Sequence, residues 1–321
     1  MSDPTRGQAR GRSGQRPHPL PRTRLCPNPF RRPRPTMVEV TVPVGALSIY
    51  DPIHLGTDEN GMPVAVTLAY RNLLAGGEPG AGKSSVLNLI VGHGALCLDC
   101  RLWLLDGKRV ELGLWREIAD VFVGSDIDYA ITKLRELQAE MDIRYAMLEA
   151  AQRRKITRDD PLDVILAVID ELAYFTVTIG TEVQQQEFRT LVRDLVARGR
   201  AAGIIVVAAT QRPSADIIPT SLRDLFGFRM AFRCTTDSSS DIILAQGWAA
   251  QGYSAKSIDP EAFGQAWLLA EGGLPRRMRC AFLTDTHIRA LVNHAKHLRR
   301  YSSGYGSDGQ DDGTTGVLHQ A

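Results

Sequence analysis

The sequence predicts an α/β fold in which a mostly parallel central sheet is flanked by helices. Short apolar runs alternate with amphipathic segments of helical period, the pattern of strands that cross between helices. The runs are almost continuously apolar, as expected for strands buried on both faces. A glycine-rich phosphate-binding pattern also joins one run to the helix after it. With 321 residues, 44% of them hydrophobic, the chain can bury one large core or two small ones.

The apolar runs place the strands and the periodic segments place the helices. Strands are expected at 72–75, 101–105, 164–169, 204–209, 228–233 and 265–270. Helices are expected at 83–97, 127–153, 183–201, 215–226, 238–246 and 285–299. In the longest helix, Asp126 can cap the first turn, and apolar residues recur at intervals of three and four. That spacing indicates core packing.

The two ends differ in composition from the middle of the chain. Residues 1–37 contain nine arginines and one acid, with many Pro and Gly, and predict a disordered arm. Residues 301–321 predict a disordered Gly/Ser/Asp tail. Between them we expect a short β-rich lead-in at 38–70 and the main α/β domain at 71–300.

Charge and cysteine content exclude several classes of protein. The net charge is +2, yet the arm concentrates positive charge, so any surface for a polyanion must be local. No apolar run reaches the roughly 18 residues of a transmembrane helix, and the N-terminus lacks the pattern of a secretion signal. We therefore expect a cytoplasmic protein that meets a membrane only through partners. Five scattered cysteines indicate structural or incidental thiols.

The most specific local signal is GEPGAGKS, a complete G-x-x-x-x-G-K-[ST] loop between an apolar run and a helical segment. Its glycines let backbone N–H groups approach phosphate oxygens, and the helix start adds a positive dipole. Lys83 would contact the β- and γ-phosphates of ATP, and the Ser84 hydroxyl would bind Mg²⁺. The residues expected to hold the nucleotide are Gly77, Glu78, Pro79, Gly80, Ala81, Gly82, Lys83, Ser84 and Ser85.

Two further strands predict the rest of a hydrolytic site. The run VILAVIDE ends in Asp170 and Glu171, at the edge of an α/β sheet where ligands collect. Asp170 is expected to order the Mg²⁺ shell, and Glu171 to polarise the attacking water. The run IIVVAAT is followed by Gln211, whose amide can bond both that water and the γ-phosphate.

The ordered set GGEPGAGKS, AVIDELA, RGRAAGIIVVAATQRPSADII and FRMAFRCTTDSSSDIILAQG resembles the FtsK/SpoIIIE family of DNA-pumping ATPases, in the HerA–FtsK branch of RecA-like motors. The segments LGTDENGMPV and LLDGKRVEL are also similar to that family. The resemblance covers about residues 52–280 and implies a RecA-like P-loop NTPase fold for the domain at 71–300.

The resemblance also implies partners. Family members act as hexameric rings around double-stranded DNA, with ATP at each subunit boundary, so homo-hexamers are expected here. An arginine from one subunit completes the neighbour's site, and the family's motif places it at Arg200, with Arg198 and Arg229 as alternatives. A guanidinium at the γ-phosphate stabilises transition-state charge. Another interpretation makes Arg200 a solvated cation near a helix end.

A motor that moves along DNA of any sequence must contact phosphates rather than bases. The residues that could do so are Arg212, Arg223, Arg229, Arg233, the hydroxyl-rich run 235–240, Arg276 and Arg277. Each of these is individually also explained as a solvated surface charge.

We therefore expect an ATP-driven double-stranded-DNA translocase. The membrane-spanning and winged-helix parts of chromosomal family members are not expected in this sequence, and a compact motor resembles the transfer proteins of actinobacterial conjugative plasmids. This favours conjugative plasmid transfer between cells, together with plasmid-encoded membrane proteins. The alternatives are a chromosome-segregation pump, a type VII secretion-like ATPase acting on proteins, and a nucleotide-gated binding module.

Overall fold

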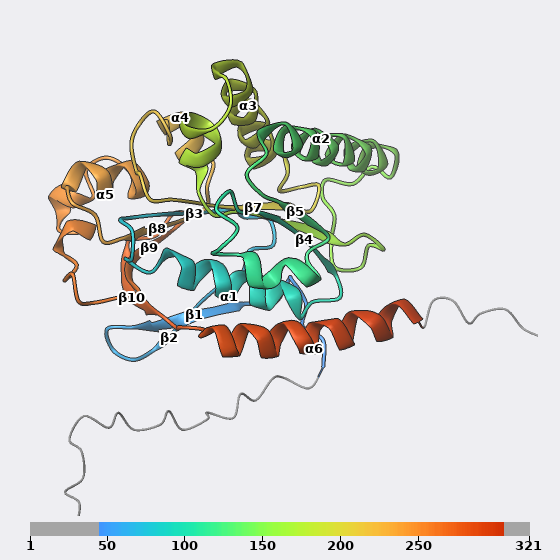
Figure 1. Ribbon diagram of the computed structural model, residues 1–321, viewed down its shortest axis with the longest axis horizontal. Coiled ribbons are helices and arrows are strands. Elements are labelled where there is room, and N and C mark those ends of the chain that lie inside the picture. The colour runs from blue at the N-terminus through green and yellow to red at the C-terminus, as the bar shows by residue number, and fades with distance from the viewer. Residues whose placement is uncertain (1–44, 305–321) are drawn as a thin grey trace, which may run out of the picture. The chain divides into compact units, whose positions relative to one another are not determined.

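A single ten-stranded sheet organises the chain in the computed structural model, which describes residues 45–304, with the side chains of 300–304 left out (Figure 1). Its strand order is β2-β1-β10-β9-β8-β3-β7-β6-β4-β5. Neighbours from β8 to β5 are parallel, and those from β2 to β8 are antiparallel. The strands are β1 (Ile53–Asp58), β2 (Pro63–Val66), β3 (Leu73–Gly76), β4 (Cys100–Leu105), β5 (Val121–Val123), β6 (Val164–Ile169), β7 (Ile204–Thr210), β8 (Phe228–Phe232), β9 (Gln265–Ala270) and β10 (Arg276–Cys280).

Helices cover both faces of this sheet. Figure 1 shows α1 and α6 on one face and α2 and α3 on the other. Strand β6 explains the arrangement, because Leu166 and its alternate neighbours join one core while Ile165 and its alternate neighbours join the other. The helices are α1 (Lys83–Ala95), α2 (Ile127–Ala150), α3 (Glu182–Arg198), α4 (Thr220–Arg223), α5 (Asp237–Leu244) and α6 (Asp285–Gly304).

The predicted α/β class is confirmed, and six predicted strands match β3, β4, β6, β7, β8 and β9. The helix predicted at 215–226 is wrong, because only Thr220–Arg223 is helical. Ile217 and Ile218 are buried although they lie in an irregular segment, and their apolar side chains resembled the buried face of a helix in the sequence. Strands β5 and β10 were missed, since β5 has three residues and β10 reads RRMRC.

The lead-in strands extend the same sheet, because β1 pairs with β10, where Gly56 lies opposite Cys280.

The predicted domain limits stay predictions, and the arm at 1–37 and the tail beyond 304 lie outside the described residues. No helix among residues 45–304 is long and apolar enough to cross a bilayer. The parallel strands have two edges: the carboxyl edge, where β3, β4, β6, β7 and β8 end, and the amino edge, where they begin.

The described cysteines are buried free thiols. Burial raises the pKa of Cys234 and of Cys280 to about 12, and it also raises the pKa of Cys97 and Cys100. Thiols this hard to ionise are poor nucleophiles, which fits the expected structural role. Cys26 lies outside the described residues.

Candidate nucleotide site

The glycine-rich loop leaves β3 at the carboxyl edge and enters α1. Gly77, Gly80 and Gly82 have φ angles of 151°, 74° and 111°, which residues with a Cβ rarely adopt. A Cβ at Gly82 would also lie 2.6 Å from the Cα of Gly264. Helix α1 begins directly after Gly82 without a side-chain cap. The N–H of Ser85 donates to the Gly82 carbonyl at 3.0 Å, and the N–H groups of Lys83 and Ser84 that precede it are suited to bind an anion such as a phosphate.

Backbone and side-chain bonds tie this loop to the neighbouring strands. The N–H of Gly77 donates to the Thr210 carbonyl at 3.3 Å, and the N–H of Glu78 donates to the Arg233 carbonyl at 2.9 Å. The Arg233 guanidinium also lies 2.6 Å from a Glu78 carboxylate oxygen. The loop is thus fixed to the ends of both β7 and β8, the two strands that flank β3.

Lys83 lies inside the loop that precedes it. Its ammonium donates at 2.7 Å to the carbonyls of both Gly77 and Glu78. Burial lowers the pKa of Lys83 to about 8, and the carboxylates of Glu171 and Asp170 oppose that shift. A buried cation held only by neutral carbonyls favours the arrival of an anionic ligand.

Asp170 follows β6 and fits the predicted Mg²⁺ role. Burial, aided by Asp106 and Glu111, raises its pKa to about 7. Its Oδ2 is buried without a hydrogen-bond partner in the described structure. Within residues 45–304 no three His, Cys, Asp or Glu form a metal-binding group. Mg²⁺ in nucleotide sites needs few protein ligands beside the phosphates, so Asp170 with the Ser84 hydroxyl fits it.

Glu171 takes a different position from its neighbour. Its carboxylate is buried and accepts hydrogen bonds from the Thr210 hydroxyl at 2.7 Å, the Gln211 N–H at 2.8 Å and the Ala173 N–H at 3.1 Å. Glu171 therefore joins the ends of β6 and β7 and fixes the backbone of Gln211. Its role as the base that polarises water stays a prediction.

These elements enclose a cleft of about 450 Å³ at the carboxyl edge. It brings together Lys83, Ser84, Asp170 and Gln211 as the sequence predicted. Glu111, Phe263, Gly264, Cys280 and Phe282 also line the cleft but were not predicted as site residues. Glu111 lies in the segment LLDGKRVEL, which resembles the family, and no motif marks the other four. The complete lining is Gly80, Gly82, Lys83, Ser84, Ser85, Glu111, Asp170, Gln211, Phe263, Gly264, Cys280 and Phe282.

Arg200 is not part of this cleft. It precedes β7 and so lies at the amino edge, where its Nε donates to the Tyr70 carbonyl at 2.6 Å. Its second guanidinium nitrogen is 3.5 Å from a Glu271 carboxylate oxygen. Seven residues of β7 separate this edge from the cleft, a length of roughly 20 Å. Arg200 therefore cannot complete the site of its own chain.

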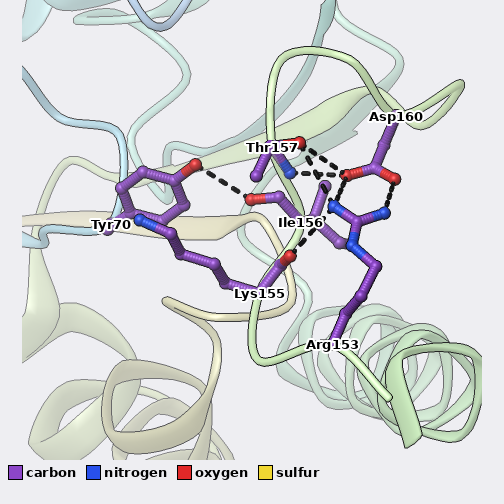
Figure 2. Close-up of polar contacts among 6 residues, drawn as sticks. All are labelled: Tyr70, Arg153, Lys155, Ile156, Thr157 and Asp160. Carbon is purple, nitrogen blue, oxygen red and sulfur yellow. Dashed lines mark hydrogen bonds and ion pairs between the residues drawn. The ribbon is translucent and has the colours of Figure 1, made fainter. Parts of the chain in front are cut away.

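Tyr70, which holds Arg200, is itself fixed by the loop before β6 (Figure 2). Its hydroxyl donates to the Ile156 carbonyl at 2.9 Å, and the Lys155 ammonium lies 4.0 Å from the centre of its ring. Arg153 and Asp160 form an ion pair that closes the same loop. The backbone of Tyr70 has φ of 66°, uncommon for a bulky residue, and this network stabilises it.

Most other predicted arginines are paired within the chain. The guanidinium of Arg198 contacts Asp194 and Asp142, that of Arg212 contacts Asp216, and Arg223 and Arg229 both contact Asp224. Arg276 and Arg277 pair with Asp58 and Glu59. The side chain of Arg223 is only 8% exposed, which leaves little of it available to contact DNA phosphates.

Comparison with known proteins confirms the resemblance seen in the motifs. Residues 40–163 match the model of the FtsK/SpoIIIE family. A DNA translocase FtsK from Chlorobaculum tepidum is 29% identical over 288 residues, covering 82% of this chain and 34% of that protein. The chain thus spans about a third of the length of the curated relatives it matches.

Solved structures agree on the fold. One described as the pCW3 conjugation coupling protein TcpA, in its monomer form with ATPγS, has a TM-score of 0.67 at 23% identity, covering 78% of this chain and 71% of that one. The cytoplasmic domain of the type VII secretion ATPase EccC from Thermomonospora curvata has a TM-score of 0.60 at 16% identity, covering 77% of this chain and 31% of that one. The chain therefore shares the fold of these solved structures.

Proposed function

We propose that this chain, whose residues 40–163 match the model of the FtsK/SpoIIIE family, is the motor of an ATP-driven double-stranded-DNA translocase for conjugative plasmid transfer. In this proposal the loop binds ATP with Mg²⁺, held by Ser84 and Asp170. Gln211 contacts the γ-phosphate, and Glu171 polarises the attacking water.

One observation carries the proposal furthest: the cleft and Arg200 lie at opposite edges of the same sheet. If Arg200 acts at a γ-phosphate, that phosphate must belong to another copy of the chain. Such sharing couples hydrolysis in one subunit to the position of the next, as a ring-shaped motor requires. A homo-hexamer around DNA, working with plasmid-encoded membrane proteins, follows from the resemblance to the family.

The conjugative role is favoured by the TcpA structure, described as a conjugation coupling protein. A chromosome-segregation pump is the second candidate, because the curated relatives are DNA translocases named FtsK. A protein-exporting ATPase is the third, supported by the fold shared with EccC.

The biochemical test measures Mg²⁺-dependent ATP hydrolysis with duplex DNA, single-stranded DNA or an unfolded polypeptide added, and displacement of a third strand from duplex DNA. Of the three additives, we expect only duplex DNA to stimulate ATP hydrolysis. We also expect displacement of the third strand to require ATP. Stimulation should fall steeply with salt if phosphates provide the contacts. Turnover indifferent to duplex DNA, without displacement, would contradict the translocase proposal.

A cellular test separates the biological roles. Donor cells without this gene should lose plasmid transfer but segregate chromosomes normally, and the wild-type gene should restore transfer where Lys83→Ala does not. A segregation defect with normal transfer would instead support the chromosomal alternative.

A further inference from the structure

Two phenylalanine side chains beside the nucleotide cleft are largely exposed to solvent, although their rings are apolar. Phe263 and Phe282 both line the cleft, and they are 69% and 72% exposed. Neither ring pairs with another aromatic ring in the described part of the chain. Exposed apolar surface next to a cleft is stabilised when a ligand covers it.

The backbone places these rings next to the phosphate loop. Phe263 precedes Gly264, whose N–H donates to the Ala81 carbonyl at 3.1 Å. Gly264 in turn accepts from the N–H of Cys280 at 2.9 Å, and Phe282 follows two residues later. The close approach of Gly82 to Gly264 adds a steric contact at the same point. The backbone beside both phenylalanines is therefore tied to the loop.

The cleft divides by chemistry into two parts. The charged groups Lys83 and Asp170 come from the loop and from the end of β6, and they suit phosphates and Mg²⁺. The segments around β9 and β10 contribute Phe263, Phe282 and small neighbours, which present apolar surface and no charge. A nucleotide has the same two parts, a charged tail and a flat aromatic base.

We propose that Phe263 and Phe282 form a platform that binds the nucleobase of ATP through its aromatic face. The proposal rests on the proposed function, because it deepens the nucleotide site. The residues that line this part of the cleft beside the two rings are Gly264 and Cys280, which offer little to read the edge of a base. The platform therefore favours purines over pyrimidines and treats ATP and GTP alike.

The experiment compares equilibrium binding of ATP, GTP, CTP and inorganic tripolyphosphate by calorimetry, at protein concentrations where the chain is monomeric. Stacking on an aromatic side chain is lost in Phe263→Ala and Phe282→Ala, so we expect ATP and GTP to bind about tenfold more weakly. Tripolyphosphate, which has no base, should bind both variants as it binds the wild-type protein. Phe282→Trp should retain or strengthen ATP binding.

Two controls separate stacking from general damage. Phe263→Leu keeps an apolar side chain without an aromatic face, and we expect it to behave like Phe263→Ala. Leu274→Ala changes another exposed apolar residue, 67% exposed and outside this cleft, and should alter no affinity. If ATP binding and tripolyphosphate binding weakened equally, the platform would be overturned, because the rings would then affect only the conformation of the phosphate loop.

Unchanged ATP affinity in both alanine variants would also overturn the platform. If those variants then failed to assemble on DNA, the exposed rings would belong to a surface between subunits. A wild-type protein that binds neither ATP nor tripolyphosphate would overturn the proposed function itself, and the platform with it. Tripolyphosphate binding alone therefore distinguishes failure of the phosphate site from failure of the base site.

Discussion

The charged residues discussed at the two edges of the parallel strands differ in the partners that the described chain gives them. Among residues 45–304, Lys83 at the carboxyl edge hydrogen-bonds only to neutral carbonyls, and one oxygen of Asp170 is buried without a hydrogen-bond partner. At the amino edge, Arg200 has both a carbonyl and the Glu271 carboxylate, and Arg153 has Asp160. Buried polar groups without partners cost free energy. The carboxyl edge is therefore suited to take up a ligand, whereas Arg200 and Arg153 at the amino edge already have partners within the chain.

This difference bears on how Arg200 could act in a second subunit. Its contact with Glu271 is 3.5 Å long and lies at a surface where both side chains are more than one third exposed. Such an ion pair contributes little free energy, so a strongly anionic phosphate can replace it. The carbonyl of Tyr70, by contrast, is held by the network of Figure 2 and can keep Arg200 oriented.

The largest expected effect tests the amino edge. Arg200→Ala should lower ATP turnover by about 10³-fold while leaving ATP affinity unchanged, because in the proposed shared site the guanidinium acts only on the transition state of a neighbour. Steady-state hydrolysis and equilibrium binding measure the two quantities. Arg198→Ala, another exposed arginine two residues away, is the matched control and should retain turnover. Mixing Arg200→Ala with Lys83→Ala subunits should recover part of the activity; no recovery would contradict sharing.

The next effect tests the carboxyl edge. Lys83→Ala should weaken ATP binding and hydrolysis on the order of 10²-fold, because it removes the buried cation that is proposed to contact the phosphates. Lys155→Ala removes a lysine from the amino edge and should leave ATP affinity as it is. If both variants lose ATP binding equally, the distinction between the edges is wrong.

An effect of similar size, but on turnover alone, is expected at the carboxylate that joins two strands. Glu171→Gln should lower turnover by about 10²-fold and leave ATP bound, because an amide cannot accept the proton of the attacking water. The variant must also rearrange the three bonds to Glu171, so thermal stability should fall slightly. Thr210→Val removes one of those bonds and keeps the carboxylate. If it loses as much turnover as Glu171→Gln, the carboxylate acts by positioning Gln211.

The smallest expected effect is on stability. His93, near the end of α1, contacts the Ser48 carbonyl at 3.0 Å, and burial lowers its pKa despite the opposing effects of that bond, Asp51 and Asp99. The unfolded chain therefore binds a proton more readily, so acid favours unfolding. Between neutral pH and pH about 5, wild-type protein should lose stability relative to His93→Gln, by at most about 1.4 kcal/mol per pH unit. Urea unfolding at several pH values measures this; parallel curves would contradict it.

Sequence patterns predicted the parts of the site that one segment can encode. The phosphate loop needs glycines and a lysine at fixed spacing, and the strand VILAVI shows its double burial through unbroken apolar character. Strand β10 escaped prediction because only Met278 and Cys280 of its five residues are buried. Phe263 and Phe282 were not predicted either, because they lie in irregular segments. The pairing of β9 with β10 brings these segments to the phosphate loop.

The sequence by itself determined three features of this protein: its fold class, its phosphate loop, and the acidic residues at the ends of buried strands. Those features depend on local spacing, which the chain preserves whatever its final shape. Only the tertiary structure decided which groups share a cleft, that Glu171 bonds to the end of β7, and that Arg200 lies at the far edge. Strand order and pairing set these distances, and they join residues far apart along the chain.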